Sequence, residues 1–137
     1  MSGFIPDASA TLPWCFEDEA TPWTESLLNR IAGGERMIVP AHWPLEVTHE
    51  LLMAVRRGRV PREKVHRFIE DLQGLSLHVE PPLSPIFWPG VLGFAEQYRL
   101  TAYDAAYLEL AQRTGLPLAT LDEALLTAAN KAGVRLL

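Results

Sequence analysis

The sequence has few of the features that mark membrane, secreted or disulfide-bonded proteins. Cys15 is the single cysteine, so no disulfide can form within the chain, and a reducing cytoplasm is compatible with that. No run of about 18 apolar residues is present, and the N-terminus lacks the basic and apolar segments of a secretory signal. We therefore expect a cytoplasmic protein without a membrane span.

Several short motifs that would indicate a particular chemistry are also absent. The sequence contains neither G-x-x-x-x-G-K-[ST] nor G-x-G-x-x-G, and no G-x-S-x-G nucleophile turn. Its histidines show no paired spacing, and one cysteine cannot complete a zinc site; the histidines are His42, His49, His66 and His78. Nucleotide-cofactor enzymes, hydrolases of that serine type and structural zinc proteins are therefore disfavoured.

The composition describes one globular domain. A chain of 137 residues with 48% hydrophobic and 21% charged residues is long and apolar enough to bury a core. It has no repeat, no flexible linker and no low-complexity segment, so we predict a single domain over residues 1–137. The net charge of −5 argues against coating nucleic acid by bulk electrostatics. It does not exclude an enzyme that meets a phosphodiester through bound cations.

Short apolar segments alternate with stretches of helical periodicity. Strands are predicted near residues 4–6, 37–39, 76–79, just before 122 and at 134–137. Helices are predicted from residue 8, over 21–31, from 44, over 61–72, through 94–98, from 101 and up to 131. The helix from residue 44 should bury Pro44, Val47, Thr48, Leu51, Leu52 and Val55. Pro81, Pro82, Pro85 and Pro89 predict a stiff loop. This alternation favours an α/β fold whose parallel sheet is covered on both faces.

Four acidic residues lie at predicted helix starts. Asp7 and Asp122 are good N-caps, Asp104 completes a capping box with Thr101, and Glu46 suits the dipole of its helix. Each acid thus has an ordinary structural explanation. However, Asp7, Glu46 and Asp122 each follow a predicted strand, and Asp104 begins the helix that leads to the strand before Asp122. In an open parallel sheet such positions share the edge where ligands bind.

A cluster of carboxylates needs something to neutralise it. Bringing several together costs energy through repulsion unless protons or cations are present, and no row of Lys or Arg lies beside these acids in the sequence. Several oxygen ligands suit Mg²⁺ or Mn²⁺ better than zinc. The pattern predicts a divalent metal site but does not name a reaction.

Four segments resemble the acid motifs of PIN-domain ribonucleases, specifically the VapC-type toxins of bacterial and archaeal toxin–antitoxin systems. They are DAS at residues 7–9, PAHWPLEVTHELL at 40–52, LTAYDAAYLELA at 100–111 and TLDEALLTAANKAGVRLL at 120–137. The resemblance covers nearly the whole chain. It implies a PIN-like three-layer α/β/α sandwich with a short, mostly parallel central sheet. It also implies Mg²⁺ or Mn²⁺ in the acidic pocket, endonucleolytic cleavage of RNA, dimerisation and silencing by a small cognate antitoxin.

The resemblance assigns the metal and catalytic roles to Asp7, Glu46, Asp104 and Asp122. Ser9 and Thr120 match positions that support the metal ligands. We expect Asp7 and Asp104 to hold the main ion, with Asp122 and Glu46 completing or assisting the site.

Two residues depart from the family pattern. Pro6 stands where an aliphatic strand residue is usual, and His49 stands near where many members have Asn. Neither departure removes a ligand, but each changes a position close to an acid.

One basic concentration has two interpretations. It comprises Arg56, Arg57, Arg59, Arg62, Lys64, His66 and Arg67, and it is either the solvated side of a helix pair or a track for the RNA backbone. Three other functions remain as alternatives: a non-catalytic binding module with the PIN fold, a stand-alone RNA-processing nuclease, and a phosphoacceptor receiver domain. The last is a poor match because residues 53–57, MAVRR, supply no Asp near position 55.

Overall fold

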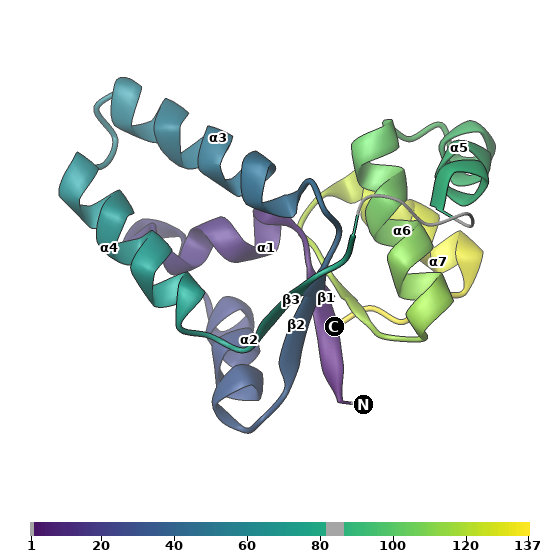
Figure 1. The fold of residues 1–137 in the computed structure, drawn as a ribbon, viewed down its shortest axis with the longest axis horizontal. Helices are drawn as coiled ribbons and strands as arrows, with labels where there is room; N and C mark the ends of the chain where they lie inside the picture. Colours follow the sequence, from purple (N-terminus) through teal and green to yellow (C-terminus); the bar gives the residue numbers. More distant parts are fainter. Residues whose placement is uncertain (1, 82–86) are drawn as a thin grey trace.

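The computed structural model describes residues 2–81 and 87–137, and within them it confirms the predicted α/β fold. Four parallel strands form one sheet in the order β3-β2-β1-β4. Helices α1–α4 lie on one side of the sheet and α5–α7 on the other (Figure 1). The strands are β1 (Gly3–Pro6), β2 (Arg36–Val39), β3 (Leu77–Val79) and β4 (Leu118–Ala119).

The helices begin close to the predicted residues. They are α1 (Ala8–Thr11), α2 (Pro22–Ala32), α3 (Trp43–Arg56), α4 (Arg62–Gln73), α5 (Phe87–Tyr98), α6 (Ala102–Thr114) and α7 (Glu123–Ala132), with 3-10 turns at Leu12–Trp14 and Glu17–Glu19. Side chains of Asp7, Thr21, Thr101 and Asp122 each accept a backbone N–H at a helix start. These bonds satisfy donors that the first helical turn leaves free. Helix α7 ends, as predicted, at Gly133, whose φ of 76° suits glycine.

The pairing of β1 with β4 sets the position of the candidate site. Ile5 pairs with Leu118 and Pro6 with Ala119, so both strands end at the same edge of the sheet. Pro6 is the last residue of β1, where its missing donor is tolerated, and the Asp7 N–H donates to the Ala119 carbonyl at 3.1 Å. β2 lies on the other side of β1. The chain therefore leaves β1 at a switch point of strand order, where open α/β sheets bind ligands.

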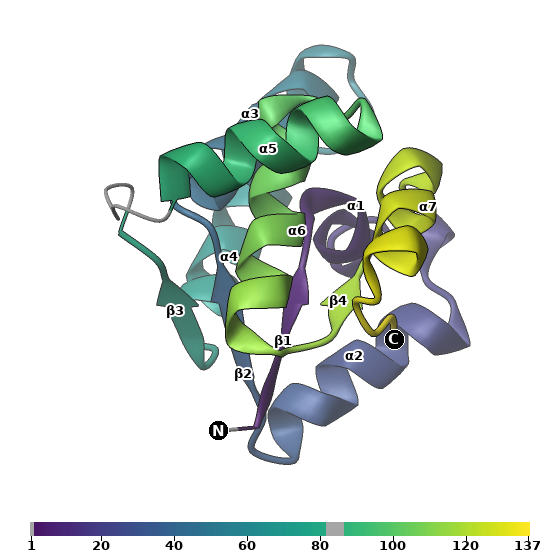
Figure 2. The ribbon, with the colours of Figure 1, turned by 90° about the vertical axis from the view of Figure 1, so that its right-hand side faces the viewer.

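Helix α6 lies at the centre of the α5–α7 layer. Its residues from Ala105 to Ala111 are all buried. One side of α6 faces the sheet and α7, and α5 covers the other side (Figure 2). One of the buried residues is Glu109, which is 3% exposed. Arg113 neutralises it through a 2.8 Å contact one helical turn later and also approaches Glu80 at 3.5 Å. A buried carboxylate of this kind is tolerated because it is paired.

Three sequence-based predictions about the elements are wrong. In α3, Pro44, Thr48 and Leu52 are exposed, because the helix buries a face rotated from the predicted one: Trp43, Val47, Leu51 and Ala54. Pro89 lies in the first turn of α5, where a missing N–H costs little, and not in a loop. The predicted strand at 134–137 is reduced to an isolated bridge between Leu136 and Leu118. Pro82 and Pro85 of the predicted loop lie outside the described residues.

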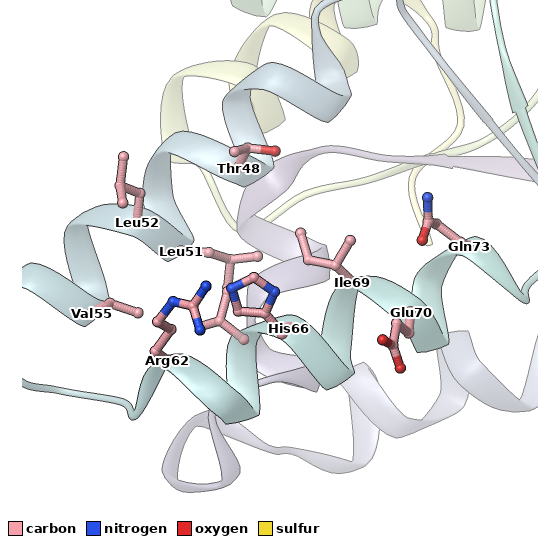
Figure 3. A pocket seen from close by; sticks show the side chains of 10 residues that line it. Thr48, Leu51, Leu52, Val55, Arg62, His66, Ile69, Glu70 and Gln73 are labelled. Atoms are coloured by element: carbon pink, nitrogen blue, oxygen red, sulfur yellow. The ribbon is translucent and has the colours of Figure 1, made fainter.

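An apolar groove lies between α3 and α4, along the face of α3 that the sequence predicted to be buried. The groove encloses about 450 Å³, and Leu51, Leu52, Val55 and Ile69 line it between the polar ends of Arg62 and Glu70 (Figure 3). None of the four predicted acids lines it. Among the described residues, no helix is long and apolar enough to cross a membrane.

Candidate functional site

Asp7 is the most buried of the four predicted acids, at 4% exposed. Its Oδ1 accepts the Ala10 N–H at 3.0 Å, which caps α1, and the Ser9 hydroxyl at 2.6 Å. Its Oδ2 accepts the Thr120 hydroxyl across the β1–β4 edge. Burial raises the pKa of Asp7, the hydroxyl and backbone hydrogen bonds oppose this, and the charge of Glu46 raises it further. Both carboxylate oxygens are therefore held in one orientation.

The two hydroxyls connect Asp7 to the start of α7. Thr120 Oγ1 accepts the Asp122 N–H at 3.0 Å, and Ser9 Oγ accepts the Leu121 N–H at 2.8 Å. Asp122 Oδ2 then caps α7 by accepting the Leu125 N–H at 2.9 Å. Ser9 and Thr120 thus fix the backbone that carries Asp122 relative to Asp7. Their predicted role in supporting the metal ligands stays a prediction.

Glu46 comes to the same place from the first turn of α3. The Tyr107 hydroxyl, from the buried side of α6, donates to its Oε1 at 2.6 Å. Burial raises the pKa of Glu46, this hydrogen bond lowers it, and the nearby Glu50 raises it. Glu46 is half-buried and oriented, so the alternative of a fully solvated acid on the polar face of α3 does not hold.

Asp104 brings the four acids together. Its backbone N–H is capped by Thr101, which leaves its half-buried carboxylate at the start of α6 facing the other acids. Burial raises the pKa of Asp104 to about 6, with further increases from the charges of Asp122, Asp7 and Glu46 in that order. The four predicted acids therefore interact with one another, as the shared sheet edge predicted. Their chemical roles stay predictions.

The donor set fits a hard divalent cation. All four ligands would be carboxylates, and the main influences on the pKa values of Asp7, Glu46 and Asp104 are burial, other acids and hydroxyl groups, none of them a Lys or Arg. Among the described residues, however, no three His, Cys, Asp or Glu side chains are already arranged around one point. Charged carboxylates repel one another unless positive charge lies between them, so binding of an ion would have to draw these acids closer together.

The chain matches the PIN domain family over residues 4–131. This chain belongs to the PIN domain family. PIN domains are generally metal-dependent nucleases, so membership supports an activity of nuclease type for this PIN domain.

A solved structure agrees on the fold. The crystal structure of PAE2754 from Pyrobaculum aerophilum is similar with a TM-score of 0.70 and 24% identity, over 93% of this PIN domain and 86% of that chain. At this identity the likeness concerns the fold alone. Among curated proteins, none matches the sequence significantly.

Residues near the acids that the sequence did not assign include Tyr107 and His42. Tyr107 is three residues after Asp104, so the helical repeat placed the two one turn apart, but nothing in the sequence indicated Glu46 as its partner. His42 lies between two tyrosines, with ring centroids 5.1 Å from Tyr107 and 5.6 Å from Tyr103. Its Nε2 is buried without a hydrogen-bond partner among the described residues, 3.9 Å from Glu46 Oε2.

Part of the basic concentration has a structural role. Arg59 binds Asp18 at 3.0 Å and Glu19 at 2.6 Å, and its guanidinium lies 4.0 Å from the centre of the Phe16 ring. Lys64 lies 3.7 Å from Glu17. The acidic turn at Glu17–Glu19 therefore neutralises two of the cations that an RNA track would use. The segment also begins at the far end of α3, about 15 Å from Glu46 by helical rise.

The raised carboxyl pKa values predict how the metal-free protein responds to pH. The folded state holds protons on Asp104 that the unfolded chain releases, so stability should fall as pH rises from about 4 to about 6. The loss should be roughly 1–2 kcal/mol, reduced by solvent at this half-buried group. Thermal unfolding in EDTA at pH 4 and pH 7 measures it, and Mg²⁺ or Mn²⁺ should restore stability at pH 7.

Asp104→Asn should flatten this pH dependence, because the uncharged amide has no proton to release. Asp71→Asn, which changes an exposed acid on α4, is the matched control and should keep the wild-type slope. Equal slopes for wild type and Asp104→Asn would show that Asp104 is not held at a raised pKa.

Proposed function

We propose that this PIN domain is a Mg²⁺- or Mn²⁺-dependent endoribonuclease and the toxin of a VapBC-type toxin–antitoxin system. The observation that carries the nuclease proposal is that the four acids meet at the carboxyl edge of the sheet, where burial, and after it the charges of Asp122, Asp7 and Glu46, raise the pKa of Asp104 to about 6. Among the described residues, no Lys or Arg contributes to the pKa shifts of Asp7, Glu46 and Asp104, and coupled carboxylates of this kind are a costly arrangement for a purely structural purpose. A site that takes up divalent cations explains it.

In this proposal each acid is held by its own structural support. Asp7 is fixed by the Ser9 and Thr120 hydroxyls, and Glu46 by the Tyr107 hydroxyl. A divalent ion bound by the acids would supply Lewis-acid activation of water and stabilise charge on the phosphate. These bonds fix the orientation of single side chains, but the acids must still move closer together to bind the ion, since among the described residues no three of them surround one point.

The toxin assignment is supported by the likeness of the four acid motifs to VapC-type toxins. It includes a small antitoxin that silences the nuclease and a homodimer as the working form. Expression of the protein alone should arrest growth, and a small upstream reading frame with a DNA-binding motif should relieve the arrest. A protein that cleaves RNA but does not impair growth fits the alternative of a stand-alone processing nuclease.

Cleavage of a single-stranded RNA should require a divalent cation. We expect products in Mg²⁺ or Mn²⁺, none in EDTA, and recovery when the cation is returned in excess. The measurement is gel analysis of end-labelled RNA. Because water is the proposed nucleophile, a substrate with 2′-O-methyl ribose at the mapped scissile position should still be cut.

That substrate also serves as the purity control, since a contaminating ribonuclease that uses the 2′-hydroxyl as nucleophile cannot cut it. Cleavage that persists in EDTA, or that the 2′-O-methyl group blocks, contradicts the proposal. RNA binding without cleavage under any divalent cation would favour the binding-module alternative.

A further inference from the structure

Exposed apolar side chains stand next to three of the four acids in the sequence. Large hydrophobic residues with high exposure directly precede three of the four acids: Leu45 is 74% exposed before Glu46, Tyr103 is 64% exposed before Asp104, and Leu121 is 52% exposed before Asp122. They come from α3, α6 and the β4–α7 connection, three segments that meet only in the folded chain. Exposed apolar groups that gather around a polar site mark a surface that binds something.

Tyr103 is held in place by the rings behind it. His42 packs against Tyr103 with the ring planes at 53° and against Tyr107 edge to face at 72°. A hydrogen bond between His42 and the Tyr103 backbone adds to this contact. Tyr107 is fully buried and donates to Glu46. A row of rings thus runs from the acid site to the surface and ends in one exposed aromatic face.

The geometry points to a base-stacking subsite: Tyr103, supported by His42, stacks on an unpaired nucleobase beside the phosphate that the acids address. The inference rests on the proposed function and assigns this chain's own residues to the RNA. Base–aromatic stacking needs an accessible base face, which single-stranded RNA offers and a duplex hides between neighbouring pairs. Leu45 and Leu121 supply apolar contact for flanking bases on the other sides of the site.

The position next to Asp104 explains why a stacking residue belongs here. Tyr103 and Asp104 are consecutive residues in the first turn of α6, so their side chains leave the helix about 100° apart and Tyr103 lies to one side of the acid. A phosphate approaching Asp104 therefore places its own nucleoside near the Tyr103 ring. The basic segment at the far end of α3 would attract the phosphates of single-stranded and duplex RNA alike. We therefore expect the preference for single strands to come from Tyr103.

The test is RNA binding measured apart from cleavage. Fluorescence anisotropy with a fluorescein-labelled unstructured RNA, and with the same strand annealed to its complement, is followed in Ca²⁺ over a series of KCl concentrations. Tyr103→Ala should weaken binding of the single strand by about tenfold, as expected for loss of one stacked base. Duplex binding and the salt slope should not change, because the phosphate contacts remain. Tyr103→Phe, which keeps the ring, should stay within about twofold of wild type.

Trp88→Ala is the matched control. Trp88 is 77% exposed but lies at the other end of α5 from the turn into α6, and Gly90 close to it packs against Glu109 rather than Asp104. Its removal should leave single-strand binding unchanged. A circular dichroism melt of each variant checks the fold, and the high exposure of Tyr103 predicts a wild-type midpoint.

The possible results test the stacking subsite and the proposed nuclease function separately. Equal binding of the single strand by wild type and Tyr103→Ala overturns the subsite. The exposed side chains of Leu45, Tyr103 and Leu121 would then be assigned to contact with a protein partner. A loss of equal size on the duplex also overturns it. Absence of any RNA binding by wild type removes both proposals. If Tyr103→Ala weakens single-strand binding but wild type cuts no RNA in Mg²⁺ or Mn²⁺, the subsite stands and the nuclease proposal falls.

Discussion

Asp104→Asn should lower RNA cleavage by about 100-fold or more while the protein stays folded. The substitution keeps the size of the side chain and leaves the α6 cap intact, since the backbone N–H of residue 104 still donates to the Thr101 hydroxyl. It removes one negative charge from the group of four acids. If Asp104 is a metal ligand, the affinity for the cation must fall with the activity. Initial rates over a Mn²⁺ titration measure both.

Substitution of Asp104 tests metal binding with less disturbance of the fold than substitution of Asp7. The Asp7 carboxylate accepts two hydroxyls and a backbone N–H in the buried interior, so Asn at that position cannot accept all of them. A loss of activity in Asp7→Asn would therefore mix lost metal binding with a disturbed β1–β4 edge. Asp104→Asn should instead unfold at the same temperature or higher in EDTA at pH 7, because repulsion among the acids decreases.

The control for this experiment is Asp71→Asn, which should cleave at the wild-type rate. Wild-type cleavage by Asp104→Asn would mean that this acid only begins a helix. A variant that is inactive but also melts well below wild type would assign Asp104 a structural role. Only the combination of lost cleavage, weaker Mn²⁺ dependence and an unchanged or raised melting temperature agrees with a ligand.

Arg113→Met should lower the free energy of unfolding by about 3 kcal/mol. Glu109 is almost completely buried in α6, and Arg113 holds it through contacts of 2.8 and 3.4 Å. Methionine preserves the packing of the aliphatic stem and leaves the carboxylate without a positive partner. Because α6 also carries Asp104 and Tyr107, a weakened helix should bring early loss of activity on heating. Urea unfolding followed by circular dichroism measures the change.

A second substitution separates the charge from the packing. Glu109→Gln combined with Arg113→Met removes both charges and should recover much of the lost stability, since no ion stays buried. Arg67→Met, at an exposed position on α4, should change stability by less than about 0.5 kcal/mol. If the double variant is no more stable than Arg113→Met, the destabilisation comes from packing and not from an unpaired Glu109.

Local signals were sufficient for most of the elements. The N-cap at Thr21 followed by Pro22 and the glycine at position 133 identified helix ends because backbone geometry at these positions depends on adjacent residues. The face of α3 was placed wrongly because Leu52 and Thr48 are compatible with either side of a helix until the neighbouring helix is known. The last strand shrank to one bridge at Leu136 because β4 itself is short.

The sequence was sufficient to predict that Asp7, Glu46 and Asp122 lie at one sheet edge, with Asp104 at the start of the helix that leads to the strand before Asp122. Alternation of strands and helices forces a parallel sheet, and the carboxyl ends of its strands must then meet. The tertiary structure alone decided what surrounds them: the Tyr107 bond to Glu46, the Thr120 bond to Asp7 and the ring pair of His42 with Tyr103. These contacts join residues as much as 113 positions apart. Pairings at such separation depend on packing, which no local pattern encodes.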